Sequence, residues 1–218
     1  MTVAEGPRSA GLIARAQNIL LKPTAEWQVI AGQPATTQGL FTGYAAILAL
    51  LPLIGTLIAR VLIGGLFGGG IGIAAALTGG LILAVVGYAL NLVMVFVVGL
   101  IINALATSFD AKSDSIQAMK VSVYAGTALW VAGIVSWVPV IGWLIGLAAL
   151  AYTCYLLYLG LKEVMQPAAD KVMVYTLATI GAQIVLYLVV GVVIGMVTAM
   201  AFVGAAATGA AALGTMPH

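Results

Sequence analysis

Four long stretches without a charged residue limit what this chain can fold into. They are free of Lys, Arg, Asp and Glu and cover residues 27–59, 61–109, 121–161 and 172–217. One membrane crossing needs about 20 apolar residues in a helix, so each stretch is long enough for at least one. Only 6% of the residues are charged and 63% are hydrophobic, against roughly 25% and 45–50% in soluble domains. The sequence therefore predicts an all-α, polytopic membrane protein.

The number of crossings follows from the interruptions in these stretches. The first opens with the polar segment GQPATTQ, which leaves residues 39–59 for one span. In the third, the segment SWVPVIGW predicts a tight hairpin between two spans, because it combines proline, glycine and two interfacial tryptophans. The second stretch has a clear span only in its back half, and the fourth has one span that begins near Met173. We predict a five-helix transmembrane bundle.

This count divides the chain into three parts. We expect a cytoplasmic N-terminal segment with interfacial helices at 1–37, a five-span domain at 38–203, and a Gly/Ala-rich tail at 204–218. Residues 61–80 are rich in glycine, which lowers helix stability. They are predicted to form an external loop, an interfacial or re-entrant segment, or an extension of the second helix. Whether the tail crosses the membrane again stays open.

Basic residues predict the orientation, because short loops rich in Lys and Arg remain cytoplasmic. With five spans and a cytoplasmic N-terminus, all of the eight basic residues except Arg60 lie inside. A sixth span at 61–80 would move four lysines outside, so the charges disfavour it.

The residues that carry chemistry are scarce. The chain has one cysteine, Cys154, and one histidine, His218, and its six acidic residues lie outside the predicted spans. These residues form no spacing typical of a metal site or a catalytic cluster. We therefore predict no catalytic, cofactor or metal site and no enzymatic activity. The low net charge of +2 gives no face for nucleic acid.

Three amides lie within the predicted spans: Asn91, Asn103 and Gln183. Because the spans contain no ionisable residue, ion-coupled transport is disfavoured. The amides are expected to form hydrogen bonds across the bundle. Alternatively, they line a pathway for a neutral or lipid-like solute.

The segment LLKPTAEW precedes the first span. Leu12, Ala16 and Ile19 share one side of a helix, while Arg15 and Lys22 lie largely on the other, which predicts an amphipathic helix on the cytoplasmic leaflet. Pro23 suits the first turn of a second short helix. Trp27 is expected at headgroup depth, and Lys22 and Glu26 are expected to form a surface pair.

A second interfacial group lies further along the chain. Tyr155, Tyr158 and Lys162 share a helical face and are expected in an aromatic belt at the inner headgroups. Gly191 and Gly195 have the four-residue spacing that lets helices approach closely, which leaves a homo-oligomer open. Asp114 is predicted to cap a helix. The expected partners are membrane lipid, a second copy of the chain, or a membrane or cytosolic protein.

Four motifs, in this order, resemble the Yip family of five-span membrane proteins. They are ILLKPTAEWQVI, LATSFDAKSDSIQAMKVSVYA, IVSWVPVIGWLIGL and YLLYLGLKEVMQPAADKVMVYT, and the resemblance covers Ala14 to Leu188. The chain departs from the family in having Asp110 where a glycine is common, and in lacking a proline soon after VYA.

The resemblance is to the bacterial members in particular, and it implies a helical membrane protein of a bacterial inner membrane with a cytoplasmic N-terminus. Eukaryotic relatives are associated with Rab GTPases, vesicle traffic and organelle shape, whereas bacterial members mostly lack an assigned activity, so no catalytic residue carries over. Two functions are predicted from the sequence and the resemblance together. The first is a scaffold or interaction role in membrane organisation or trafficking, and the alternative is a channel or transporter for a neutral or lipid-like solute.

Overall fold

The fold is built from helices throughout the part of the chain that the structure describes, with no strand in it. A computed structural model describes residues 11–214, apart from the side chains of 63–64, 67–80, 82–83, 193 and 197–214. The elements are α1 (Leu12–Leu21), α2 (Pro23–Gly32), α3 (Thr37–Leu40), η1 (Phe41–Ala45), α4 (Ala46–Leu48), α5 (Leu50–Ala106), η2 (Thr107–Phe109), α6 (Ser115–Ala125), α7 (Thr127–Gly133), α8 (Ile141–Gly160), η3 (Leu161–Met165) and α9 (Val172–Gly214).

The chain divides into two compact units at a point within α9. The first unit ends at Thr179 and the second begins at Ile180. The first turns of α9 belong to the first unit, where the Tyr175 hydroxyl donates a hydrogen bond to the Ile102 carbonyl and its ring stacks on Phe109 at 4.9 Å. The predicted tail is helical as far as Gly214, and residues 215–218 lie outside the described part.

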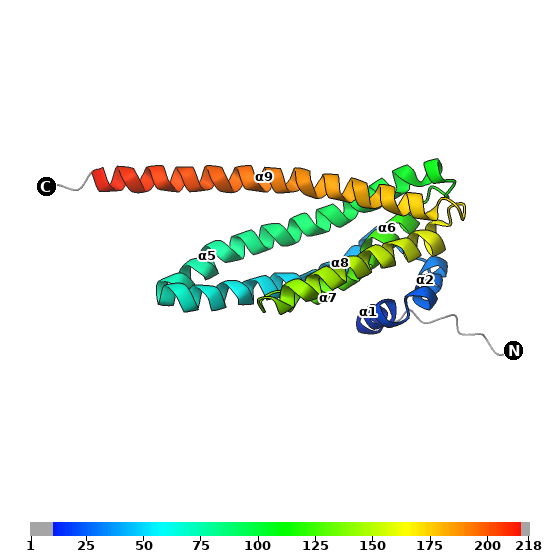
Figure 1. The fold of residues 1–218 in the computed structure, drawn as a ribbon, viewed down its shortest axis with the longest axis horizontal. Coiled ribbons are helices and arrows are strands. Elements are labelled where there is room, and N and C mark those ends of the chain that lie inside the picture. Colours follow the sequence, from blue (N-terminus) through cyan, green and yellow to red (C-terminus); the bar gives the residue numbers. More distant parts are fainter. Residues whose placement is uncertain (1–10, 215–218) are drawn as a thin grey trace. The chain divides into compact units, whose positions relative to one another are not determined.

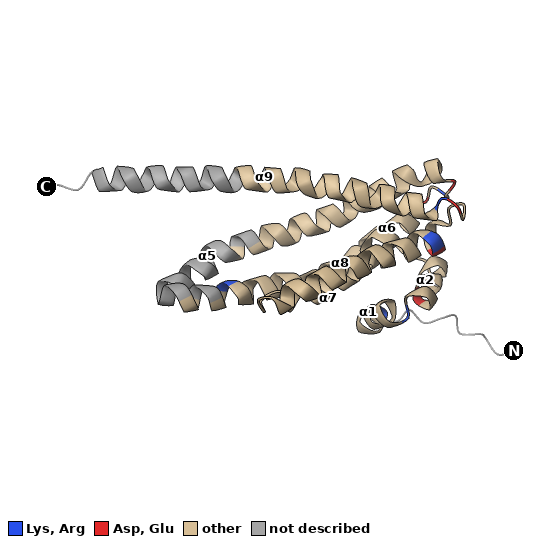
Figure 2. Ribbon diagram, viewed as in Figure 1, with Lys and Arg blue, Asp and Glu red and all other residues tan. Residues whose placement is uncertain are grey.

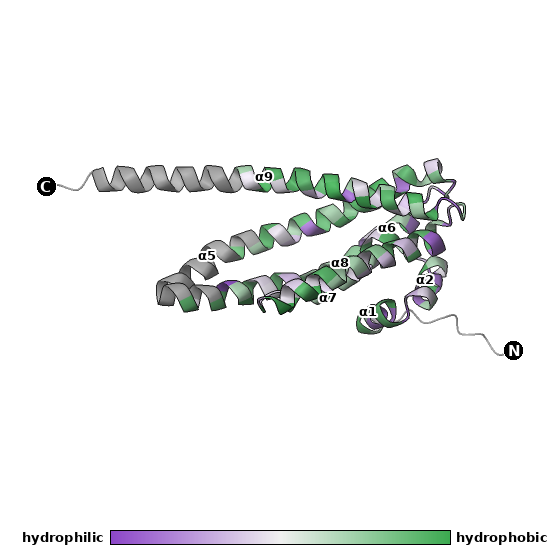
Figure 3. Cartoon of the chain, in the orientation of Figure 1, coloured by the Kyte–Doolittle hydropathy of each residue, from purple (hydrophilic) through white to green (hydrophobic). Residues whose placement is uncertain are grey.

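Four helical segments among the described residues are long and apolar enough to cross a membrane. Their bounds are Thr37–Leu62, Ala84–Phe109, Ile141–Met165 and Val172–Met196. Figure 3 shows apolar residues predominating along the two spans at either end of α5 and along α8. The predicted third span corresponds to α6 and α7, which Gly126 separates. The described residues therefore contain four candidate spans, and a fifth segment, α6 with α7, in which neither helix is long enough to cross by itself.

Residues 61–80 fall inside α5, whose bounds are Leu50–Ala106. Of the three conformations predicted for this segment, the extension of the second helix matches that backbone. The described portions at the two ends of α5 lie side by side (Figure 1), and the Tyr88 hydroxyl near one end donates to the Ala46 carbonyl, just before the other, at 2.9 Å. The first two spans are therefore neighbours.

The predicted turn at SWVPVIGW is present, and it joins α7 to α8. α7 ends at Gly133 and α8 begins at Ile141, and Val140 between them has a φ of 64°. A Cβ at Gly133 would lie 2.5 Å from the Pro52 Cβ, so only glycine permits this close approach of α7 to α5. Trp143, at the start of α8, is 68% exposed, as expected of an aromatic residue at a membrane surface.

The loop from η2 to α6 is built on two aspartates. Asp110 has a φ of 54°, a left-handed conformation that glycine adopts freely and that aspartate tolerates better than most residues. The structure thus keeps the backbone that a glycine at this position favours. The Asp110 carboxylate also pairs with Lys171 at 2.5 Å. The predicted cap is confirmed, because the Asp114 carboxylate accepts from the backbone N–H groups of Ile116 and Gln117.

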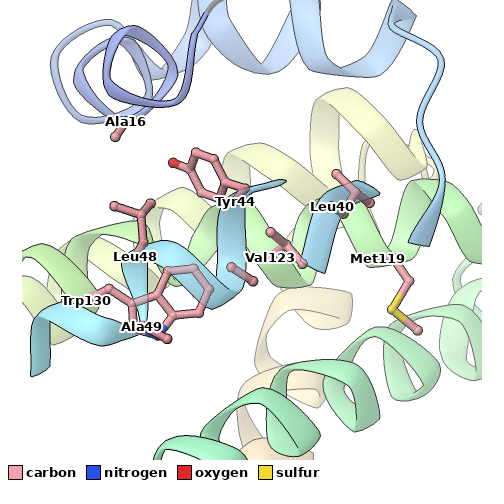
Figure 4. Packing of buried hydrophobic residues seen from close by; sticks show 9 residues of the cluster. Ala16, Leu40, Tyr44, Leu48, Ala49, Met119, Val123 and Trp130 are labelled. Carbon is pink, nitrogen blue, oxygen red and sulfur yellow. The ribbon is translucent and has the colours of Figure 1, made fainter. Parts of the chain in front are cut away.

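The main apolar cluster joins α1, the start of the first span, α6 and α7 (Figure 4). Tyr44 lies near its centre, and its ring packs edge-on against Tyr124 with 4.6 Å between centroids. Buried apolar area of this kind contributes roughly 25 cal/mol per Å². The cluster contains Ala16, Leu40, Tyr44, Ala45, Leu48, Ala49, Met119, Val123 and Trp130.

Candidate functional site

An ion pair enclosed by protein connects α1 to α2. The Arg15 guanidinium donates to the Glu26 carboxylate at 2.5 Å and also to the Gln33 side chain, and the exposed fractions of the Arg15 and Glu26 side chains are 5% and 8%. The guanidinium also lies 5.8 Å from the centroid of the Tyr124 ring. Two charges removed from water persist only when each is the other's partner. The pair therefore fixes how the two N-terminal helices cross.

Lys120 of α6 binds the C-terminal end of α2. Its ammonium group donates to the carbonyls of Ile30 at 2.9 Å and Gln33 at 2.6 Å, and Lys120 is 3% exposed. The last carbonyls of a helix lack partners within the helix and carry its negative dipole end. The Lys120 ammonium group supplies hydrogen bonds to these carbonyls and a positive charge at the negative end of the helix dipole, and it thereby fixes α2 against α6.

Trp27 fills a site between α2, α6 and α8. It is 0% exposed, and a Cβ at Gly160 would lie 2.9 Å from its ring. Only glycine at position 160 therefore leaves room for the indole. Nearby, the Tyr152 hydroxyl of α8 donates to the Leu20 carbonyl at the end of α1 at 2.7 Å. The N-terminal helices are thus docked on the bundle at several independent points. We call α1 and α2, docked in this way, the N-terminal platform.

These contacts correct three expectations from the sequence. Trp27 was expected to face the headgroups, but protein encloses it. Arg15 was placed on the solvated side of α1, but it is buried. The expected Lys22–Glu26 surface pair is wrong, because Glu26 turns inward to Arg15 while Lys22 is exposed. The pairing of residues eleven positions apart depends on the angle between two helices, which no local pattern encodes.

The remaining interfacial candidates lie at the surface or near it. Pro23 occupies the first turn of α2, as predicted. Tyr155 is 45% exposed, and its ring lies 5.7 Å from Tyr152. Tyr158 is half-buried, and Lys162 is exposed with its ammonium group 3.6 Å from the Glu163 carboxylate. Figure 2 shows the charged residues of the first unit gathered near α2 and the start of α9. One basic position lies apart from them on α5, and it is Arg60, the sole charged residue in the sequence of that helix.

The three intramembrane amides have different surroundings. The Asn91 side-chain oxygen accepts from the Trp130 indole N–H at 2.9 Å, which joins α5 to α7. The Asn103 oxygen accepts from the Ser113 hydroxyl at 3.2 Å, near the loop that follows η2. Gln183 is half-buried in the second unit. Asn91 therefore makes a contact between helices, as expected of these amides, whereas Asn103 bonds to the loop that follows its own helix. Among the described residues, no three His, Cys, Asp or Glu side chains form a metal-binding group.

The helices and their apolar surfaces define a multi-pass, helical integral membrane protein. Residues 18–191 match the Yip1 domain family. The chain is 30% identical over 161 residues to the inner membrane protein YohC of Escherichia coli K12, and equally to YohC of Escherichia coli O6:H1; the match covers 72% of this chain and 82% of each relative. This chain belongs to the Yip1 domain family. No solved structure matches it.

Proposed function

We propose that this protein is a non-enzymatic Yip-type protein of a bacterial inner membrane, and that it organises the membrane by presenting a fixed surface to a protein partner. The observation that carries the proposal is the docking of the N-terminal platform. Arg15, Glu26 and Lys120 are buried in polar contacts that hold α1 and α2 on the bundle. A segment that served only as a flexible lead into the first span would not need these contacts.

The charged loops beside the platform extend this surface. Glu163 of η3 accepts a hydrogen bond from Gln28 of α2 at 3.5 Å, and Lys162 beside it is exposed. Lys112 and Asp114 are exposed in the loop before α6. Charged groups around a rigid helix pair give orientation and selectivity to a protein contact. We propose that a partner binds here from the cytoplasm.

The proposed topology has five crossings, with α6 and α7 together forming the third. Gly126 interrupts this crossing, and Trp130 of α7 packs against it. The N-terminus is cytoplasmic, because the basic residues then lie inside except for Arg60. A topology reporter fused after Ser113 should read cytoplasmic, and one fused after Arg60 should read external. If the reporter after Ser113 read external and the one after Arg60 read cytoplasmic, the proposed orientation would be wrong. If both reporters read the same side, the chain would not cross the membrane between Arg60 and Ser113.

Photocrosslinking in native membranes tests the interaction role. A photoreactive residue at Thr24 of α2 or at Lys112 should capture the same protein, identified by mass spectrometry. Ser136, in the hairpin between α7 and α8, serves as the matched control and should not capture it. Reversal of two surface charges, Lys112→Glu with Lys162→Glu, should reduce capture at Thr24. If the photoreactive residues at Thr24 and Lys112 both captured only lipid and other copies of this chain, the proposal would be refuted.

The contacts of Asn91 and Asn103 give no reason to prefer a solute pathway. Each amide oxygen already accepts a bond from a neighbouring side chain. A transport role would call for polar groups that line one continuous path. We therefore keep the interaction role as the single proposal.

A further inference from the structure

A pocket of about 250 Å³ lies between the first two spans, which are the two ends of α5. Four polar residues line it, two from each span: Thr56, Arg60, Tyr88 and Asn91. The structure includes Arg60 in the candidate span Thr37–Leu62, whereas the span predicted from the sequence ended at residue 59. A charged residue within a membrane span is rare and usually marks a functional site. The pocket thus contains the one charge that α5 carries.

The length of the first span places Arg60 at a membrane surface. The span begins at Thr37, within the polar segment GQPATTQ, and Arg60 follows 23 positions later. This separation is about 35 Å of helix at 1.5 Å per residue, and the hydrocarbon core is about 30 Å thick. Thr37 and Arg60 therefore lie at opposite surfaces of the membrane, whichever of the two is cytoplasmic. Side chains on a helix lean toward its N-terminus, so Arg60 reaches back into the pocket that it lines.

The pocket opens toward lipid. Two of the residues that line it, Arg60 and Gly87, are exposed. The apolar side chains of Ile54 and Val85, next to lining residues in the sequence, are 42% and 51% exposed, and lipid tails are as apolar as such side chains. A Cβ built at Gly87 would meet no heavy atom within 4 Å. A lipid molecule can therefore enter the pocket from within the bilayer.

The charge of the pocket is positive and has no counter-charge in the described part of the chain. Arg60 is the sole charged residue in the sequence of α5, and no ion pair or hydrogen bond among the described residues involves its side chain. The described acidic residues lie apart from it, near α2 and the start of α9 (Figure 2). A charge in a membrane span pairs with a group of opposite charge or with acceptor oxygens. Here the structure leaves that role to a ligand.

The free hydrogen-bonding groups of the pocket are mainly N–H donors. The Asn91 oxygen accepts from an indole N–H of α7, whereas no described residue accepts a hydrogen bond from the Asn91 NH2 group. The hydroxyl protons of Thr56 and Tyr88 are already donated to backbone carbonyls of the first span, at 2.8 and 2.9 Å. The guanidinium adds five N–H donors. The pocket therefore suits a ligand that is anionic and rich in acceptor oxygens, such as a phosphodiester with neighbouring ester carbonyls.

We propose that this pocket binds the phosphate headgroup of one anionic phospholipid, in the leaflet opposite Thr37. The Arg60 guanidinium donates to two phosphate oxygens in the paired geometry that this group favours. The Asn91 NH2 group donates to an ester carbonyl, and the acyl chains lie along Ile54 and Val85. The site does not depend on the proposed protein partner, since it lies at the membrane surface opposite the N-terminal platform.

Native mass spectrometry of the full chain in detergent tests the site. The probes are phosphatidylglycerol, phosphatidylcholine with the same acyl chains, and inorganic phosphate. One phosphatidylglycerol per chain should bind at least about tenfold more tightly than phosphatidylcholine, because hydrogen bonds to a net anionic group are the stronger ones. Inorganic phosphate at the same concentration should not displace it, since it lacks the ester carbonyls and the acyl chains.

Two pairs of variants locate the lipid. Arg60→Gln should lower the affinity for phosphatidylglycerol at least about tenfold, whereas Lys22→Gln, which removes an exposed positive charge outside the pocket, should leave it unchanged. Gly87→Leu should lower the affinity by filling the pocket. Gly146→Leu is its matched control, because a Cβ there also meets no heavy atom within 4 Å. Arg60 is exposed, so Arg60→Gln should shift the melting temperature by no more than about 2 °C.

Four results would overturn the proposal. Equal loss of binding in Arg60→Gln and Lys22→Gln would show a general attraction of lipid to basic residues. Equal binding by Gly87→Leu and Gly146→Leu would place the lipid elsewhere. Equal affinity for the two lipids would remove the role of the charge. Displacement of phosphatidylglycerol by inorganic phosphate would identify a site for a soluble anion.

Discussion

Replacing Glu26 with methionine is expected to release the N-terminal platform from the bundle. The change removes the carboxylate from a pair whose side chains are 5% and 8% exposed, so Arg15 remains buried without its counter-charge. Breaking a buried pair from one side costs about 3–5 kcal/mol. Gln33 remains as a partner of Arg15, so we expect a value toward the lower end of that range.

Hydrogen–deuterium exchange of residues 12–32 measures this opening directly. A cost of 3–5 kcal/mol corresponds to a roughly 100- to 4,000-fold increase in the opening constant. Protection of the backbone amides in α1 and α2 should fall by that factor, while α8 keeps its protection. Lys162→Gln is the matched control, because it breaks an ion pair with an exposed lysine, and such pairs contribute about 0–1 kcal/mol.

The double variant separates the charge effect from lost packing. Arg15→Met with Glu26→Met replaces both charges by apolar side chains, an exchange that is often neutral or stabilising. Its protection should therefore exceed that of either single variant. If the double variant lost the sum of the two single effects, or if Glu26→Met changed protection less than about threefold, the reasoning from the buried pair would be refuted.

Three further changes test neighbouring contacts. Lys120→Met should lower the amide protection at the C-terminal end of α2 by about 1.5–3 kcal/mol, because the hydrogen bonds from the charged ammonium group to the α2 carbonyls are lost. Unchanged amide exchange in α2 would contradict this contact. Gly160→Val should displace Trp27 and lower the melting temperature, while Gly146→Val should not, and equal melting temperatures would exclude the close fit. Asp110→Gly should be tolerated, whereas Asp110→Val should cost about 1–2 kcal/mol more, because valine resists a positive φ; equal stability in a denaturant titration would argue against the left-handed turn.

The sequence was informative wherever a signal is local. The charge-free stretches predicted the apolar helices, and SWVPVIGW predicted the hairpin, because proline and glycine act on the backbone at their own positions. Asp114 was identified as a cap from its spacing to the next helix, and Pro23 as a first-turn residue for a similar reason. These features depend on residues within a few positions of each other.

The candidate site could be predicted only in part. Lys22, Pro23, Trp27 and Glu26 were selected from one short segment, which lies in the N-terminal platform. The roles of Trp27 and Glu26 were misassigned, since both side chains face protein. Arg15 and Lys120 were missed as site residues, because a basic residue in an amphipathic segment ordinarily faces water.

The sequence by itself determined that this protein is a helical membrane protein, because burial of apolar side chains and pairing of the backbone in lipid leave few other solutions. Only the tertiary structure decided which polar groups are enclosed. Lys120 reaches the end of α2 across about 90 positions of chain, and Gly160 makes room for Trp27. Such contacts depend on how helices cross in space, and hydropathy and spacing along the chain carry no record of that geometry.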